Sequence, residues 1–458
     1  MRSYSLGRPF WILPLSALIL LLTVCSDPEE SDGFNSLFEQ YGEPMTSVPA
    51  TEDILMYEVN LRAFSPSGDI QGLIADLDRL DSLNINVIWL MPIQEVGEEK
   101  SLNSPYCVKN YLEVGSEYGD LEDLRALTTA AHARGMAVIL DWVANHTAWD
   151  HPWIEEHPDW YQQDADGNII IPPGTNWADV AQLDMGKASL RAAMTEAMEY
   201  WVLEANIDGF RCDYADGVPS IFWKEALRRL KSIPERRLIL LAEGSSRDRF
   251  SDGFQIIYSW NYYSRLKDVA GGSAANELSL THLDDYRALG EGYQYLRYST
   301  NHDQSAWDAT PVQLFGGTEG ALAYAAAAMF SGGIPLIYTG QESGREETVN
   351  FFRRDAIDWS ENADMQKAFY SLTRQYSEGE AFRRGTLRWF SNDAMHLVRY
   401  DLDSDTLLAA VNLRGSRETR TLDEGLWFSR WQDLQSGEIL NWEQRLTMDP
   451  YEIRLLRK

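Results

Sequence analysis

The sequence predicts an α/β fold, a (β/α)8 TIM barrel with a short subdomain inserted after strand 3 and a C-terminal antiparallel β-sandwich domain. Short apolar runs alternate with segments of helical periodicity from about residue 54 to residue 377. Eight of these runs have the length and composition of strands, which favours a closed barrel over an open sheet. After about residue 384 the sequence pattern changes and predicts short strands joined by turns.

The barrel is expected to begin with a strand at 54–60, followed by a helix at 70–83 whose apolar residues recur at helical spacing. The run at 87–93 is almost entirely apolar, as expected of a parallel strand covered on both faces. A helix at 121–134 ends before Gly135, a residue type that often terminates helices. The further expected strands are 137–141, 207–213, 238–243, 254–260, 295–301 and 334–339, and the further helices are 187–205, 220–232, 319–330 and 364–377.

Two segments depart from this alternation. Residues 145–184 are far longer than an ordinary strand-to-helix loop, so they predict a small subdomain over the barrel mouth. We therefore assign 51–383 to the barrel and 384–458 to the C-terminal β-domain, with strands at 387–390, 395–402, 406–412 and 451–457. Five tryptophans near or within the insertion are either sugar platforms or packing residues: Trp142, Trp149, Trp153, Trp160 and Trp177.

The N-terminus has the pattern of an export signal. Arg2 and Arg8 precede an apolar run at 10–24, which has the length of a signal peptide and is short for a membrane span. The run ends at Cys25 and an acidic stretch follows, so residues 1–25 resemble a bacterial lipoprotein signal with Cys25 as the lipidated residue. Residues 26–50 then form a linker, and the protein is exported and anchored to the membrane by lipid alone, at the periplasmic or cell surface. The alternative is ordinary secretion with an incidental cysteine.

Composition excludes several classes of function. A net charge of −30 argues against nucleic acid as a partner, because phosphates would be repelled. The other two cysteines, Cys107 and Cys212, are too few for a disulfide scaffold and predict buried thiols. No spacing of Cys or His residues suggests a zinc site.

Three short motifs carry acidic residues at the ends of apolar runs. They are Gly-Phe-Arg-Cys-Asp at 209–213, Ala-Glu-Gly at 242–244 and Asn-His-Asp at 301–303. The carboxyl ends of barrel strands meet at one mouth, so Asp213, Glu243 and Asp303 are expected to share a pocket. A pair of carboxyl groups is what cleavage of a glycosidic bond requires. Each motif alone is more typical of an ion pair or a turn, but their joint placement favours catalysis.

Together with Asp-Trp-Val-Ala-Asn-His at 141–146, these motifs resemble glycoside hydrolase family 13, the α-amylase family, from about residue 50 to the end. The resemblance implies that Asp213 is the nucleophile, Glu243 the general acid and base, and Asp303 a third carboxylate that binds sugar hydroxyls. Glu243 should then have a raised pKa, because it must begin the reaction protonated. The resemblance also implies substrate-binding roles for Tyr106, Asp141, His146, Arg211 and His302.

The sequence departs from the family pattern next to the catalytic positions. Many members carry a Lys-His pair shortly after the nucleophile, where this chain has Asp216 and Gly217. Asn145 matches a calcium-liganding asparagine of the family, but its partner ligands are not identifiable, so calcium stays open. No cofactor is required for the chemistry itself.

The sequence therefore predicts a retaining α-glucan hydrolase that cleaves α-1,4-glucosidic bonds in starch, glycogen or maltooligosaccharides through a covalent glycosyl-enzyme. Two alternatives within the family stay open, a transglycosylase and an exo-acting α-glucosidase. A non-catalytic glycan-binding relative is disfavoured, because such proteins typically lose one of the three carboxylates.

Overall fold

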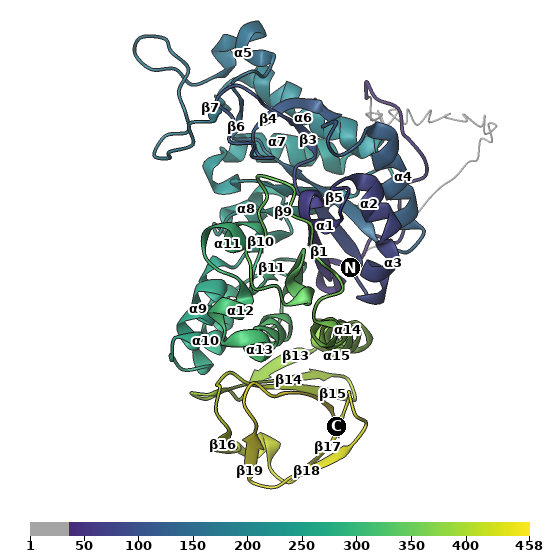
Figure 1. The fold of residues 1–458 in the computed structure, drawn as a ribbon, viewed down its shortest axis with the longest axis vertical. Coiled ribbons are helices and arrows are strands. Elements are labelled where there is room, and N and C mark those ends of the chain that lie inside the picture. The colour runs from purple at the N-terminus through teal and green to yellow at the C-terminus, as the bar shows by residue number, and fades with distance from the viewer. Residues whose placement is uncertain (1–35) are drawn as a thin grey trace, which may run out of the picture. The chain divides into compact units, whose positions relative to one another are not determined.

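Eight parallel strands close into a barrel in the computed structural model, which describes residues 36–458 (Figure 1). Their order around the barrel is β1-β12-β11-β10-β9-β8-β5-β2, so the expected (β/α)8 fold is confirmed. The strands are β1 (Met56–Val59), β2 (Val87–Leu90), β5 (Ala137–Trp142), β8 (Gly209–Cys212), β9 (Ile239–Ala242), β10 (Ile256–Tyr258), β11 (Gln294–Arg297) and β12 (Ile334–Tyr338).

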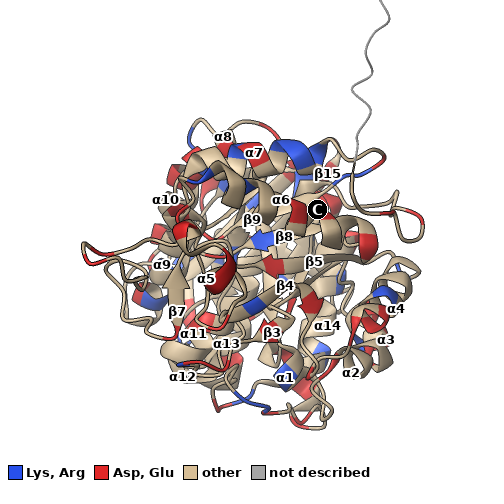
Figure 2. Ribbon diagram, turned by 90° about the horizontal axis from the view of Figure 1, so that it is seen from above, with Lys and Arg blue, Asp and Glu red and all other residues tan. Residues whose placement is uncertain are grey.

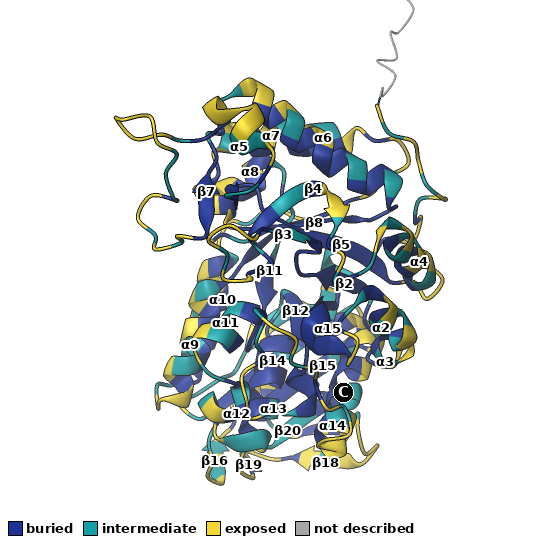
Figure 3. Ribbon diagram, turned by 45° about the horizontal axis from the view of Figure 1, so that its top comes forward, coloured by how far each residue is buried: buried dark blue, intermediate teal, exposed yellow. Residues whose placement is uncertain are grey.

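The barrel strands are buried on both faces, which explains their near-continuous apolar sequences (Figure 3). Alternate side chains such as Val87, Trp89, Ile139 and Leu241 point inward and form one apolar cluster with their neighbours. These side chains fill the barrel, so the space for a ligand lies at its mouth.

Helices surround the strands, and Figure 2 shows β5, β8 and β9 inside a ring that includes α4, α6 and α7. The same view shows acidic residues on many of the surrounding helices and loops. The helices are α1 (Leu61–Phe64), α2 (Ile70–Ala75), α3 (Leu77–Ser82), α4 (Leu121–His132), α6 (Ala188–Glu204), α7 (Ser220–Lys231), α8 (Asp248–Asp252), α9 (Trp260–Ala270), α10 (Asn276–Asp285), α11 (His302–Trp307), α12 (Pro311–Leu314), α13 (Gly317–Met329), α14 (Ala363–Glu378) and α15 (Glu380–Arg384).

Two details of the helical prediction are corrected. The helix expected at 70–83 is divided at Asp76 into α2 and α3. The strand expected at 254–260 stops at Tyr258, and α9 and α10 fill the interval before β11, where no helix was predicted. The aromatic residues at the start of α9 have strand propensity, but Tyr262, Tyr263, Leu266 and Val269 bury one helical face.

The insertion after the third barrel strand contains β6 (His146–Ala148), α5 (Trp153–Glu156) and β7 (Val180–Gln182). β6 and β7 pair antiparallel, with His146 opposite Gln182. A second small sheet, β3 (Gln94–Val96) with β4 (Val108–Val114), follows the second barrel strand. Cys107 packs with Ala148 and Val180, which joins the two small sheets.

The C-terminal segment is an antiparallel β-domain, as predicted. One sheet has six strands in the order β13-β14-β15-β20-β17-β18, and β16 pairs with β19 in a second sheet. An apolar cluster containing Leu397, Leu408, Trp431 and Met448 draws on both sheets. The strands are β13 (Thr386–Trp389), β14 (Met395–Leu402), β15 (Asp405–Asn412), β16 (Glu418–Thr421), β17 (Ser429–Asp433), β18 (Ile439–Trp442), β19 (Arg445–Met448) and β20 (Ile453–Arg457).

Residues 37–458 form one compact unit that holds both the barrel and the β-domain. Arg414 in the β-domain donates hydrogen bonds to the carbonyl oxygens of Val269 at 2.8 Å and Ser273 at 2.6 Å. The Tyr324 hydroxyl on α13 donates to the Leu413 carbonyl at 3.2 Å. The boundary expected near residue 384 therefore stays a prediction.

Residues 1–35 lie outside the described part of the chain, and with them the expected signal segment and Cys25. Between residues 36 and 458, none of the helices combines the length and hydropathy needed to cross a membrane. Cys107 and Cys212 are buried free thiols, as predicted.

Candidate active site

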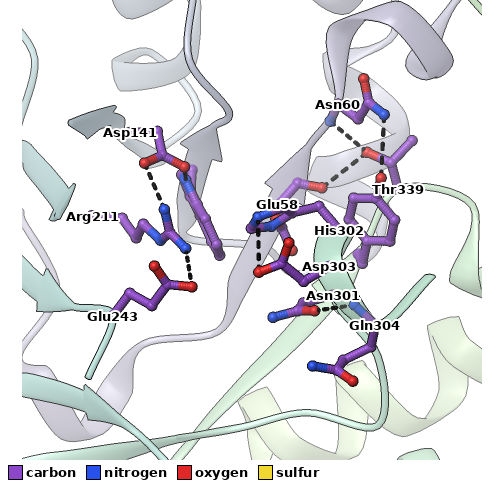
Figure 4. A network of polar contacts seen from close by, with 12 residues as sticks. Glu58, Asn60, Asp141, Arg211, Glu243, Asn301, His302, Asp303, Gln304 and Thr339 are labelled. Carbon is purple, nitrogen blue, oxygen red and sulfur yellow. Dashed lines mark hydrogen bonds and ion pairs between the residues drawn. The ribbon is translucent and has the colours of Figure 1, made fainter. Parts of the chain in front are cut away.

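A cleft of about 660 Å³ opens at the barrel mouth, between the barrel loops and the insertion after β5. Six of the residues singled out from the sequence line it: Tyr106, His146, Asp213, Glu243, His302 and Asp303. Asp141 and Arg211 are buried against these residues (Figure 4). The carboxyl ends of separate strands thus bring together side chains that are far apart in the sequence.

Arg211 on β8 holds three carboxylates. Its Nη1 donates to Asp141 at 2.8 Å and to Asp213 at 2.9 Å. Its Nη2 lies 2.8 Å from Glu243, an ion pair without the alignment of a hydrogen bond (Figure 4). Arg211 lies on β8 and Asp213 directly follows its last residue, Cys212, so the two side chains are two residues apart and point to the same side. Arg211 thus pairs with Asp213 and also contacts Glu243.

Burial and the shared guanidinium together set the protonation of these carboxyl groups. Burial raises the pKa of Glu243 to about 7, although Arg211 opposes the rise. Burial likewise raises the pKa of Asp213 to about 6, again against Arg211. Between these two values Asp213 is ionised while Glu243 keeps its proton, which is the arrangement that a nucleophile and an acid need.

Asp303 lies in the first turn of α11, beyond the end of β11 at Arg297. The Asn301 side chain caps this helix by accepting the backbone N–H of Gln304 at 2.8 Å. The sequence placed Asn-His-Asp at the end of a strand, and the structure corrects this to a helix start. A helix N-terminus favours nearby negative charge, so an acidic side chain suits this position.

His302 is held between two acidic groups (Figure 4). Its Nδ1 pairs with the carboxylate of Glu58, and its Nε2 lies 3.5 Å from Asp303. Burial lowers the pKa of His302, but Asp303 and Glu58 outweigh burial and raise it to about 9. His302 is therefore positively charged at neutral pH, beside the carboxylate expected to bind sugar hydroxyls.

Sequence reasoning missed Glu58. It is fully buried on β1, and one of its carboxylate oxygens has no hydrogen-bond partner within the described chain. An acidic residue inside the apolar run at 54–60 is the signal that would have found it. Trp89 on β2 was missed as well, although its Nε1 donates to Asp141 at 3.2 Å.

Tyr106 contacts both Asp141 and His302. Its hydroxyl lies 3.0 Å from Asp141 and 2.8 Å from His302 Nε2, and its ring stacks on the His302 ring with centroids 5.3 Å apart. His146 also lines the cleft, and burial lowers its pKa to about 4. His146 is therefore neutral at the pH where Glu243 is protonated, whereas His302 is charged.

Of the five tryptophans considered as sugar platforms, Trp177 lines the cleft. The others have packing roles. Trp142 is fully buried, Trp153 and Trp160 pack against each other, and the Trp149 ring contacts the Lys100 ammonium.

The environment of Asn145 does not fit a calcium ligand. Its side-chain amide exchanges hydrogen bonds with the amide of Gln182, at 3.2 Å in both directions. Its backbone oxygen accepts from the same Gln182 amide at 3.0 Å and from the Leu183 N–H at 3.1 Å. Within residues 36–458, no three His, Cys, Asp or Glu side chains gather as a metal site would require. We therefore derive no step through calcium.

Residues 30–173 match the α-amylase catalytic domain. The chain is 30% identical over 336 residues to α-amylase MalA of Haloarcula japonica, a match that covers 70% of this chain. It spans about half, 48%, of the length of that relative. Among solved structures, an α-amylase from Lactobacillus plantarum superposes with a TM-score of 0.80 at 28% identity, covering 90% of this chain and 100% of that one. A noncanonic maltogenic α-amylase, AmyB from Thermotoga neapolitana, has a TM-score of 0.80 at 26% identity, covering 89% and 98%.

Proposed function

We infer that the chain belongs to the α-amylase family of glycoside hydrolases, and we propose that it hydrolyses α-1,4-glucosidic bonds with retention of configuration. The observation that carries the proposal is the contact of one buried guanidinium, Arg211, with both Asp213 and Glu243 at the cleft floor. The raised pKa of Glu243, about 7, gives that residue a proton to donate near neutral pH.

In the first step, a carboxylate oxygen of Asp213 attacks the anomeric carbon of the sugar that lies over Tyr106. The bond from that carbon to the glycosidic oxygen breaks, and the oxygen takes the proton of Glu243. The leaving sugar departs with a free hydroxyl, and the remaining sugar is an ester of Asp213.

In the second step, the Glu243 carboxylate takes a proton from water while the water oxygen attacks the anomeric carbon. The ester bond breaks, Asp213 is released as a carboxylate, and Glu243 regains its proton. Two inversions at one carbon give net retention. Charged His302 and the carboxylate of Asp303 hold the ring hydroxyls, and such hydrogen bonds stabilise the charge that develops in the transition state.

An α-glucan is the substrate class that the observations support best. A relative and two solved structures that are similar to the chain carry the name α-amylase. A neutral sugar polymer also suits a protein with a net charge of −30, which repels anionic polymers.

The test is to incubate the full-length chain with maltoheptaose, starch and trehalose and to separate the products over time. We expect maltooligosaccharides of mixed length early in the reaction, in the α-anomeric form. Glucose as the sole early product would identify an exo-acting glucosidase, and products longer than the substrate would identify a transglycosylase. Asp213→Asn should abolish turnover while the protein still folds, and retained activity would refute the role of Asp213.

We further propose that the protein is exported and lipid-anchored through Cys25. The support is the sequence pattern alone, a basic start and an apolar run that ends at a cysteine. Expression in a bacterium fed with labelled fatty acid should label the protein. Cys25→Ala should lose the label and move the protein from the membrane to the soluble fraction. Label retained in Cys25→Ala would refute the assignment.

A further inference from the structure

The residue that follows the nucleophile has an unusual backbone. Tyr214 has φ +43° and ψ +42°, a left-handed conformation that is unfavourable for a bulky side chain. Its backbone N–H donates to Glu243 at 2.6 Å, and the next N–H, of Ala215, donates to the Glu243 carbonyl at 2.8 Å. These bonds hold the strained turn and leave the Tyr214 side chain 39% exposed, lining the cleft.

Asp216 and Gly217, where the sequence departs from the family pattern, are the residues that hold this turn. A Cβ on Gly217 would lie 2.1 Å from the Tyr214 ring, so the ring rests against the space that a side chain would fill. The Asp216 carboxylate accepts the backbone N–H groups of Ser245 at 2.8 Å and Ser246 at 3.3 Å. A Cβ on Gly244 would lie 2.5 Å from that carboxylate. Gly217 therefore leaves room for the Tyr214 ring, and Asp216 fixes the loop after Glu243.

The Tyr214 ring has an aromatic neighbour from the insertion. The Trp177 ring meets it edge to face, with centroids 5.3 Å apart and an interplanar angle of 75°. Trp177 in turn lies edge to face against His146, at 5.6 Å. Trp177 and Tyr214 thus line the cleft together, supplied by two separate segments of the chain.

The role of Glu243 indicates which sugar of the substrate Trp177 and Tyr214 contact. Glu243 protonates the glycosidic oxygen, so the leaving sugar lies on the Glu243 side of the broken bond. His302 contacts both Tyr106 and Asp303, the residues assigned to the sugar that Asp213 attacks. The backbone N–H of Tyr214 donates to Glu243, and Tyr214 lines the cleft together with Gly244.

We propose that Tyr214 and Trp177 form an aromatic platform for the sugar on the leaving-group side and so determine which α-glucans are cleaved efficiently. The inference rests on the proposed hydrolase function. Aromatic faces stack on the apolar faces of sugar rings, and a partly exposed ring whose position is fixed in advance loses little entropy on binding.

The test compares two substrates. Maltoheptaose places sugars on the leaving-group side, whereas α-maltosyl fluoride has only fluoride there. Tyr214→Asn removes the ring but keeps a residue that adopts left-handed backbone readily. We expect the ratio of kcat/KM for maltoheptaose to that for α-maltosyl fluoride to fall on the order of tenfold in this variant. Tyr214→Phe, which keeps the ring, should keep the wild-type ratio.

Two further variants guard against a folding failure of Tyr214→Asn. Trp177→Ala removes the other ring, and Gly217→Ala displaces the Tyr214 ring without deleting it, so both should lower the same ratio. A ratio that stays at the wild-type value in Tyr214→Asn would overturn the platform. If both substrates lose activity equally, Tyr214 acts only through Glu243. If the wild-type protein cleaves neither substrate, the proposed function itself fails.

Discussion

Replacing Glu243 by glutamine removes the charge from the carboxyl group assigned as the acid, and the effect on stability should depend on pH. The side chain is only 12% exposed, and burial raises its pKa from 4.5 to about 7. Folding therefore favours the protonated form. The ionised form costs stability, and this cost is absent below pH 4.5, grows as the pH rises and is complete above about pH 7.

The size of the effect follows from the two pKa values. The interval of about 2.5 pH units between them corresponds to about 3 kcal/mol, at 1.36 kcal/mol per unit. Glutamine resembles the protonated acid and does not titrate. The stability of Glu243→Gln relative to wild type should therefore rise by about 2–3 kcal/mol between pH 5 and pH 8.

The assay is thermal unfolding of both proteins at half-unit steps between pH 5 and pH 8.5. Glu291→Gln is the matched control, because Glu291 is exposed and its substitution should give no pH-dependent difference. A difference between Glu243→Gln and wild type that stays constant across this range, or that shrinks as the pH rises, would refute the account of Glu243 as a carboxyl group protonated near neutral pH.

Two further outcomes follow from the same electrostatics. The kcat/KM of the wild-type protein on maltoheptaose should be highest between about pH 6 and pH 7, because Asp213 gains a proton below this range and Glu243 loses one above it. A flat pH profile from pH 5 to pH 9 would contradict the assignment of Asp213 and Glu243. Glu58→Gln should lower the pKa of His302 below its value of about 9. The kcat/KM of Glu58→Gln, divided by that of wild type, should then fall about threefold or more from pH 5.5 to pH 8. A loss of activity that is the same at all pH values would assign Glu58 a purely structural role.

The sequence could predict the barrel because its strands are buried on both faces and so read as apolar runs between amphipathic helices. The same argument failed around α9. There, the aromatic residues before Asn261 favour the strand predicted at 254–260, and helical packing of Tyr262, Leu266 and Val269 overrides that propensity from Trp260 onward. β16 and β19 were not predicted either, because each is four residues long and β16 is entirely polar.

The carboxylates of the site could be predicted because each lies within a short motif that follows an apolar run. Glu58 could not be placed in the same way, since its role depends on contact with His302, 244 residues away in the sequence. Tyr214 was missed for another reason. Its importance depends on a left-handed backbone and on the missing side chain of Gly217, neither of which a motif reveals. Both residues act through neighbours that only the fold supplies.

Trapping the covalent intermediate tests the central claim most directly. A fluorinated α-maltosyl fluoride that forms the glycosyl-enzyme quickly and releases it slowly should add one glycosyl mass to the protein. Peptide mass spectrometry should locate that mass on the carboxylate of Asp213, and the adduct should be absent from Asp213→Asn. Label on another residue, or turnover of the reagent with no covalent adduct, would contradict a retaining mechanism in which Asp213 is the nucleophile.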